Sequence, residues 1–244
     1  MRRRRDRLEP LRRIARAVPG GIAAGRWLRR QLSPELRALE RLRREHSGAL
    51  FQPYATTAED RYPQLFDALA QRLAHLPAPR ILSFGCSTGE EVRALRARLP
   101  NARITGIDLN PRSLAIARKN DTDPLSYYRL AGAPLPGDRF DAVLAMAVFR
   151  HGVLEAEQPV ECSAVLPFAR FAEGVALLDT SLEPGGWLAL YNSHFRFSDT
   201  PTSAGYACDP LRMTDHRPRD LLYGPDNQRL LGVTDNTVLF RKLA

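Results

Sequence analysis

The segment Arg80–Val92 places two glycines, small hydroxyl residues and two carboxylates directly after a short apolar run. Gly85 and Gly89 permit a tight backbone turn, because glycine adopts positive φ angles without steric cost. Asp108 ends a second apolar run and lies 19 positions after Gly89. An acidic residue at about this spacing meets the ribose hydroxyls in a nucleotide-binding β–α–β unit. The two segments therefore predict a site for an adenosine-containing cofactor.

The spacing of the glycines distinguishes between such cofactors. A dinucleotide-binding turn requires the pattern G-x-G-x-x-G, but Ser87 stands at the second glycine position and Glu90 at the third. The Glu90 carboxylate would repel a pyrophosphate, whereas it can accept charge-assisted hydrogen bonds from an ammonium group. S-adenosylmethionine carries an ammonium group, so we expect it as the cofactor. An NAD-dependent dehydrogenase is the alternative that these residues favour least.

Four segments resemble the successive motifs of class I S-adenosylmethionine-dependent methyltransferases: Gly85–Glu91, Ile107–Asp108, Phe140–Val143 and Leu182–Leu188. The likeness runs from about Thr56 to the C-terminus, and its first motif is similar to that of the chemotaxis-receptor glutamate methyltransferases. By this resemblance Glu90 holds the methionine amino group, Asp108 the ribose and Arg61 the methionine carboxylate. The cofactor-binding residues that the resemblance implies are Arg61, Gly85, Cys86, Ser87, Thr88, Gly89, Glu90, Asp108, Leu109, Asn110 and Met146.

The chain departs from the family pattern in two places. Ser83 stands two residues before the first glycine, where many class I enzymes have an acid. Glu90 or Arg61 must therefore take over part of the recognition of the amino-acid end. Met146 and Ala147 stand where the receptor methyltransferases have an Arg-Asn pair, which weakens the assignment of a receptor as the substrate.

Strands and helices alternate along most of the chain. The strands are expected at 80–84, 103–108, 126–131, 140–146 and 187–192, and the helices at 88–99, 111–120 and 168–182. This alternation predicts an α/β fold with a Rossmann-like, doubly wound, mostly parallel sheet. By the resemblance, the segments Leu221–Tyr223 and Thr237–Leu243 pair as a C-terminal antiparallel hairpin. A helix over Thr56–Leu73, with Thr56 and Glu59 in capping-box spacing, is expected to pack beside the cofactor site.

Two histidines are the candidate general bases. Ligand sites in open parallel sheets lie at the carboxyl ends of the strands, and His151 and His194 each follow the end of a predicted strand. An amine or hydroxyl acceptor must lose a proton when it is methylated, whereas a carboxylate acceptor need not. The sequence leaves open whether a base is used and whether oxygen or nitrogen accepts the methyl group. For each histidine taken alone, a hydrogen bond to backbone or water is the simpler interpretation.

The distribution of charged residues predicts that the chain has two parts. Residues 1–50 hold 15 arginines, no lysine and 5 acids, whereas residues 51–244 hold 21 basic and 22 acidic residues. We expect an Arg-rich helical N-terminal extension over 1–50 and a catalytic domain over 51–244. Residues 1–30 suit weak contact with nucleic acid or an acidic membrane, although a solvated tail is the simpler interpretation.

The cysteine content and the apolar runs of the chain indicate the cellular environment that we expect. Three cysteines match neither a disulfide framework nor a paired zinc motif, so we expect a reducing, cytoplasmic environment and no metal. The sequence contains neither the long apolar run of a transmembrane segment nor a secretory signal. The expected function is methyl transfer to a small molecule or a protein side chain. RNA methylation that uses the basic arm, and a non-catalytic scaffold that keeps the fold, are the alternatives.

Overall fold

The computed structural model describes residues 40–42, 44–45, 50–52, 57–214 and 221–244. The chain divides into two compact units, Met1–Ser47 and Gly48–Ala244. In the first unit the described residues, 40–42 and 44–45, are helical. The basic helix expected nearer the N-terminus lies outside the described residues. The expected boundary between an extension and a catalytic domain at residues 50 and 51 stays a prediction.

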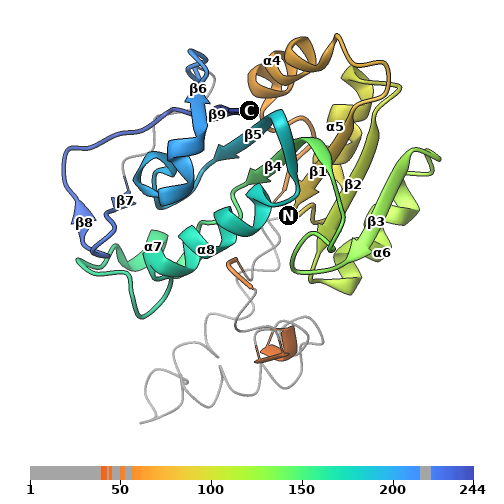
Figure 1. The fold of residues 1–244 in the computed structure, drawn as a ribbon. Helices are drawn as coiled ribbons and strands as arrows, with labels where there is room; N and C mark the ends of the chain where they lie inside the picture. The colour runs from red at the N-terminus through yellow and green to blue at the C-terminus, as the bar shows by residue number, and fades with distance from the viewer. Residues whose placement is uncertain (1–39, 43, 46–49, 53–56, 215–220) are drawn as a thin grey trace, which may run out of the picture. The chain divides into compact units, whose positions relative to one another are not determined.

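A seven-stranded sheet forms the centre of the second unit, in the order β3-β2-β1-β4-β5-β9-β6 (Figure 1). Strands β1 to β5 are parallel, and β9 is antiparallel to both β5 and β6. This arrangement confirms the predicted mostly parallel Rossmann-like sheet. The strands are β1 Arg80–Phe84, β2 Arg103–Asp108, β3 Ser126–Leu130, β4 Phe140–Met146, β5 Leu182–Tyr191, β6 Tyr206–Cys208 and β9 Leu239–Lys242. The helices are α4 Pro63–Leu73, α5 Glu90–Arg98, α6 Pro111–Asn120, α7 Gly152–Glu157 and α8 Phe168–Asp179.

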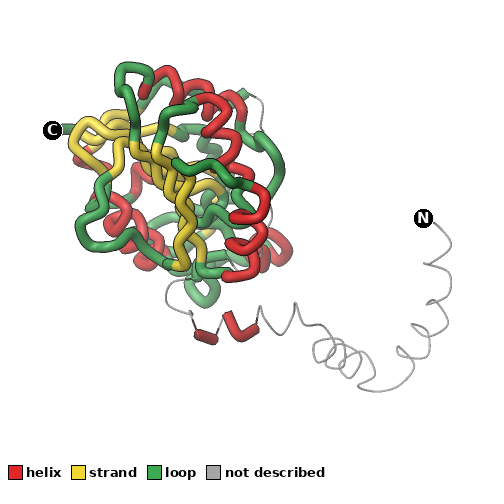
Figure 2. Tube along the Cα trace, turned by 90° about the vertical axis from the view of Figure 1, so that its right-hand side faces the viewer, coloured by secondary structure: helices red, strands yellow, loops and turns green. Residues whose placement is uncertain are grey.

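Helices cover both faces of this sheet (Figure 2). Because successive strand residues point to opposite faces, Ile81 and Leu82 of β1 belong to two different buried clusters. Ile81 packs in the cluster that holds the apolar residues of α4, α5 and α6. Leu82 packs in the cluster that holds those of α7 and α8. Apolar runs that are buried on both faces are typical of parallel strands, which is why the sequence predicted them well.

Helix α4 is shorter than the sequence suggested. It begins at Pro63, a residue favoured in the first turn of a helix, and Tyr62 is its N-cap without a side-chain capping bond. Glu59 lies in a turn before the helix and Thr56 lies outside the described residues, so the predicted helix start near Thr56 is wrong. The predicted apolar face is confirmed, since Leu65, Phe66, Leu69 and Leu73 are all buried. Pro63 sets the start of the helix, because the residue before a proline is disfavoured in helical conformation.

The predicted C-terminal hairpin is wrong, because β9 does not pair with the segment at residues 221–223. Strand β9 pairs with β6, which lies in the long segment 198–219 that the sequence left without a strand. The segment Leu222–Tyr223 instead forms strand β7, which pairs with β8 (Arg229–Leu230) in a separate two-stranded sheet. Three residues of β6 have too little periodicity to predict a strand, and the pairing is set by tertiary contact with β9.

The bend before β5 also differs from the expectation. We predicted a helix to residue 182 and a strand from residue 187, but α8 ends at Asp179 and β5 already begins at Leu182. The register against β4 shifts between Phe140 and Ala142, and Gly185 has a φ of +77° within this irregularity. The glycine pair therefore marks a bulge within the strand rather than a turn before it.

The helix glycine Gly174 provides a test of the packing between α8 and the aromatic core. A Cβ atom at this position would lie 2.8 Å from Phe51 Cζ and 2.9 Å from Phe149 Cε1. Alanine is favoured over glycine within a helix by about 1 kcal/mol, but overpacking costs about 1–3 kcal/mol. We predict that Gly174→Ala lowers the free energy of unfolding, measured by chemical denaturation, by about 1–2 kcal/mol. Gly205→Ala is the matched control, because no atom lies within 4 Å of a Cβ there. A Gly174→Ala protein more stable than the parent would contradict the packing.

Candidate functional site

The turn after β1 is shaped by close backbone approaches. Gly85 has a φ of +74°, and a Cβ atom there would lie 2.6 Å from Val148 Cγ2. The backbone N–H groups of Gly85 and Cys86 both donate to the carbonyl oxygen of Ile107, at 2.9 and 3.0 Å. Gly89, with a φ of +86°, is the N-cap of α5. The turn is thus fastened to the end of β2, as the motif predicted.

Ser87 connects this turn to the carboxylate at the tip of β2. Its backbone N–H donates to Asp108 Oδ2 at 2.9 Å, and its φ is +49°, in the left-handed region that serine adopts rarely. The Ser87 hydroxyl is buried and has no hydrogen-bond partner among the described residues. A buried hydroxyl without a partner costs free energy.

Asp108 is held by backbone donors. Besides Ser87, the N–H of Asn110 donates to Asp108 Oδ1 at 2.7 Å. Burial raises the pKa of Asp108 above its ordinary value, and backbone N–H groups of Asn110, Ser87 and Leu109 oppose that rise. The carboxylate is therefore fixed at the carboxyl end of β2, beside the turn. The Asn110 side chain itself caps α6, accepting from the N–H of Arg112 at 3.0 Å, which is a structural role.

The Glu90 carboxylate contacts residues of its own turn and helix. Thr88 Oγ1 donates to both Glu90 carboxylate oxygens at 2.7 Å, and Arg93 lies 3.7 Å from Glu90 Oε1. Glu90 does not line the cavity beside the turn. The expectation that Glu90 holds an amino group stays a prediction.

A cavity of about 50 Å³ opens between α4, the glycine turn and the end of β4. It brings together several residues predicted for the cofactor site, namely Arg61, Gly85, Cys86, Ser87 and Met146, with Thr57, Ala58, Tyr62, Phe66 and Glu91. Cys86 contributes a small packed surface, since a Cβ atom on Gly106 would lie 2.8 Å from its Sγ. Burial raises the pKa of the Cys86 thiol well above its ordinary value, which favours the protonated thiol over the nucleophilic thiolate.

Glu91 is the site residue that the sequence reasoning missed. Ser83 Oγ on β1 donates to Glu91 Oε1 at 2.6 Å. Burial raises the pKa of Glu91 to about 7, and the hydrogen bond from Ser83 opposes this rise. The sequence contained a signal for this contact. Ser83 stands where many class I enzymes have an acid, and a second glutamate, Glu91, directly follows Glu90. The chain supplies the carboxylate from α5 instead of from the strand.

His151 caps a helix. It is the N-cap of α7, and its Nδ1 accepts from the N–H of Val153 at 3.2 Å. The neutral ring in this arrangement carries its proton on Nε2.

His194 is buried, with 1% of its surface exposed. Its Nδ1 lies 3.2 Å from the carbonyl oxygen of Leu221, and its Nε2 lies 3.4 Å from that of His151. Glu155 Oε1 is 3.6 Å from the same Nε2. Burial lowers the pKa of His194, while these acceptors oppose the change. Both ring nitrogens therefore face acceptor groups of the protein, and the role of His194 as a base stays a prediction.

A polar row lies at the carboxyl ends of β4 and β5. Arg150 contacts the Asn192 side chain and pairs with Glu155 at 2.7 Å. Asn192 Nδ2 donates to the Tyr62 hydroxyl at 3.4 Å, and Asn192 has a φ of +56°. Non-glycine residues in this conformation cluster at functional sites. The row borders the cavity through Tyr62.

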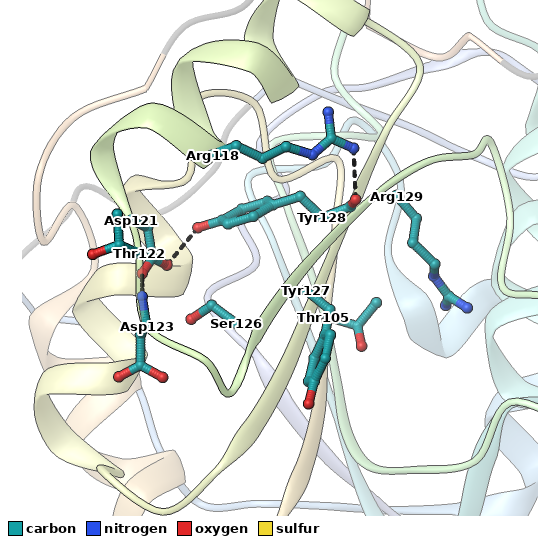
Figure 3. A pocket seen from close by; sticks show the side chains of 9 residues that line it. All are labelled: Thr105, Arg118, Asp121, Thr122, Asp123, Ser126, Tyr127, Tyr128 and Arg129. Atoms are coloured by element: carbon teal, nitrogen blue, oxygen red, sulfur yellow. Dashed lines mark hydrogen bonds between the residues drawn. The ribbon is translucent and has the colours of Figure 1, made fainter.

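A wider hollow of about 570 Å³ lies at the edge of the sheet, along β3 and the end of α6 (Figure 3). Two of its polar side chains bond to each other or to the backbone: Tyr128 donates to Asp121 at 2.7 Å, and Arg118 donates to the Tyr128 carbonyl oxygen at 2.7 Å. None of the predicted site residues lines it. Five of the predicted cofactor-binding residues line the smaller cavity instead.

No group of three or more His, Cys, Asp or Glu side chains among the described residues is arranged to hold a metal ion. Within the same residues, no helix combines the length and apolar character needed to cross a bilayer.

Comparisons with known proteins agree with this geometry. Residues 81–166 match the family model of a methyltransferase domain. The chain is 38% identical over 129 residues to the biotin biosynthesis bifunctional protein BioCD of Bordetella avium, which covers 51% of this chain and 24% of that protein. It is 47% identical over 49 residues to trans-aconitate 2-methyltransferase of Klebsiella pneumoniae, covering 20% of this chain and 19% of that enzyme.

The chain thus spans less than a third of the length of these curated relatives. Among solved structures, the N-methyltransferase NodS from Bradyrhizobium japonicum aligns with a TM-score of 0.47 at 15% identity, over 76% of this chain and 99% of that one. The matched segment 81–166 contains the glycine turn, Asp108 and β4. The matched residues 81–166 are therefore similar to a methyltransferase domain.

Proposed function

We propose that the chain transfers a methyl group from S-adenosylmethionine to an oxygen or nitrogen atom of a small molecule or a protein side chain. The observation that carries this proposal is the hydrogen bond from the Ser87 N–H to Asp108 Oδ2, at 2.9 Å, which joins the glycine turn to the end of β2. It sets a carboxylate at a strand tip beside a turn without side-chain bulk, where a nucleoside can approach the backbone. A packing-only scaffold has little need of this arrangement.

The residues beside the turn fit the cofactor in kind. Asp108 would accept hydrogen bonds from the ribose hydroxyls, and Arg61 would pair with the methionine carboxylate. The buried Ser87 hydroxyl, which has no hydrogen-bond partner among the described residues, is available to the ligand. The other predicted contacts are the turn backbone at Gly85, Cys86, Thr88 and Gly89, with Leu109, Asn110 and Met146.

The chemistry required of the protein is mostly positioning. The cofactor supplies a methyl group on a positively charged sulfur, and the protein holds the acceptor in line with it. Positioning of this kind accounts for about 7–11 kcal/mol of a barrier. Rigid strand ends, such as the carboxyl ends of β4 and β5 beside Tyr62 and Asn192, suit that task.

The engaged histidines favour an acceptor that needs no protein base. His151 accepts a backbone N–H and His194 faces backbone carbonyl oxygens on both sides. A carboxylate attacks without losing a proton, so it is the acceptor that this chemistry favours. The name of one relative, trans-aconitate 2-methyltransferase, contains that of a carboxylate, aconitate. A carboxylate acceptor agrees with that name. RNA methylation through residues 1–30 has no support in the structure, because those residues lie outside the described part.

The role of Asp108 can be tested by calorimetry. We predict that Asp108→Asn weakens binding of S-adenosylhomocysteine by about 1–3 kcal/mol, because a charge-assisted hydrogen bond to ribose is lost. Asp123→Asn is the matched control, since Asp123 lines the wider hollow at β3 (Figure 3). Unchanged affinity for Asp108→Asn, or an equal loss for Asp123→Asn, would contradict the assignment.

Two variants of His151 distinguish a role as helix cap from a role as general base. We predict that His151→Ala lowers the free energy of unfolding by about 1 kcal/mol, whereas His151→Asn, with another good capping residue, keeps it. Methyl transfer to a panel of carboxylic acids, followed with a labelled methyl group, should persist in His151→Asn. Loss of transfer by a factor of about 100 or more in this stable variant would instead identify His151 as the base.

A further inference from the structure

Strands β4 and β5 end side by side, and a left-handed residue follows each of them. Met146 pairs with Tyr191, and the N–H of Ala147 donates to the Tyr191 carbonyl oxygen at 2.9 Å. The φ angle is +59° at Ala147, directly after β4, and +56° at Asn192, directly after β5. Non-glycine residues in this conformation cost free energy and cluster at active sites and ligand clamps. Two of them at neighbouring strand ends favour a ligand site here.

Arg150 is the basic residue of the polar row, which consists of Glu155, Arg150, Asn192 and Tyr62. One terminal nitrogen of Arg150 contacts the Asn192 side-chain oxygen, and the other lies 2.7 Å from Glu155 Oε2. Each of these nitrogens carries two N–H groups, so the two contacts leave a further donor on each. The Arg150 side chain is 33% exposed. The guanidinium is therefore held in direction and still open to an anion from solvent.

The polar row connects Arg150 to the cofactor cavity. Asn192 accepts from Arg150 through its side-chain oxygen, and its Nδ2 donates to the Tyr62 hydroxyl at 3.4 Å. Tyr62 is buried, and it lines the cavity together with Met146 of β4. A single residue, Asn192, thus separates Arg150 from the wall of the cavity. A small molecule whose reacting end lies beside Tyr62 meets Arg150 with its other end.

Glu155 sets how strongly Arg150 attracts an anion. Its carboxylate pairs with Arg150 and also lies 3.6 Å from Nε2 of the buried His194. The Glu155 side chain is partly exposed, and exposed ion pairs are weak. A carboxylate of a ligand can therefore compete with Glu155 for Arg150, and it can bind both terminal nitrogens in the bidentate geometry that arginine favours.

We propose that the methyl acceptor is a small dicarboxylate, of which one carboxylate receives the methyl group while Arg150 binds the other. This inference rests on the proposed function, because it names the substrate class of the same site. The reacting carboxylate needs a free lone pair, so it is not the one held by Arg150. As its oxygen bonds to the methyl carbon, the electron pair of the carbon–sulfur bond stays on sulfur and no proton is transferred. The product is a monomethyl ester.

Matched acids distinguish an anchor for a second carboxylate from general binding. Succinate, glutarate and adipate differ from butyrate, valerate and hexanoate, respectively, by that second carboxylate. In calorimetry on the full chain saturated with S-adenosylhomocysteine, at least one dicarboxylate should bind about 10- to 100-fold more tightly than its monocarboxylate partner, the gain expected from hydrogen bonds between charged groups. With S-adenosylmethionine labelled on the methyl group, the same dicarboxylate should give a monomethyl ester with the higher kcat/KM.

Variants of the ion pair distinguish a substrate anchor from a structural contact. Arg150→Gln should abolish the preference for the dicarboxylate and leave monocarboxylate binding unchanged, which also shows that the variant is folded. Arg150→Lys should keep part of the preference, because it keeps the charge and loses the bidentate fork. Glu155→Gln should strengthen dicarboxylate binding about 2- to 5-fold, because the competing carboxylate is removed.

Arg139 provides the matched control. It lies directly before β4, at the end of the strand opposite to Arg150, and it donates to the Asp138 carbonyl oxygen at 2.8 Å. Arg139→Gln removes the same charge from the chain. It should therefore keep the preference for the dicarboxylate at the value of the parent chain.

The outcomes separate this inference from the proposed function. If each dicarboxylate binds and reacts no better than its monocarboxylate partner, the anchor is overturned while the proposed function stands. Equal losses of both kinds of acid in Arg150→Gln and Glu155→Gln would likewise show that the pair is only structural. If the full chain does not bind S-adenosylhomocysteine, the proposed function itself fails.

Discussion

The hydrogen bond from the Ser87 N–H to Asp108 joins the two elements on which the site depends. It requires a left-handed serine, a glycine turn narrow enough to meet β2, and a carboxylate that ends β2 facing β1. The parallel pairing of β1 with β2 brings those two strand ends together, from Arg80 beside Arg103 to Phe84 beside Ile107. Helices on both faces then shield the strands, so the rigid core positions a small polar site at its edge.

Two partly buried carboxylates near this turn have different sets of donors. Asp108 accepts from backbone N–H groups, which favour the ionised form against the cost of burial. Glu91 accepts from the Ser83 hydroxyl, and burial raises its pKa to about 7.

The sequence predicted the parts of the fold that rest on local pattern. Strands β1, β2 and β4 have the predicted bounds, because apolar runs buried on both faces leave little choice of conformation. The positions of the turn and of Asp108 also followed from spacing. The pairing of β9 with β6 did not, since three residues such as Tyr206–Cys208 contain no periodicity and their partner lies far along the chain.

The side-chain roles were harder to predict than the backbone. Glu90 and Glu91 are adjacent and identical in type, and only the helix rotation decides which one faces the cavity. His151 and His194 lie at the expected strand ends, yet one caps a helix and the other bonds to backbone carbonyl oxygens. Position along the chain predicts proximity to a site, whereas hydrogen-bond partners decide what a titratable group can do there.

The most direct test of the account is a crystal structure of the full chain with S-adenosylhomocysteine. The account predicts that the ribose hydroxyls lie within about 3 Å of the Asp108 carboxylate, with the amino-acid end in the cavity beside Arg61. A ligand bound in the hollow along β3, or a ribose that has no contact with Asp108, would contradict it.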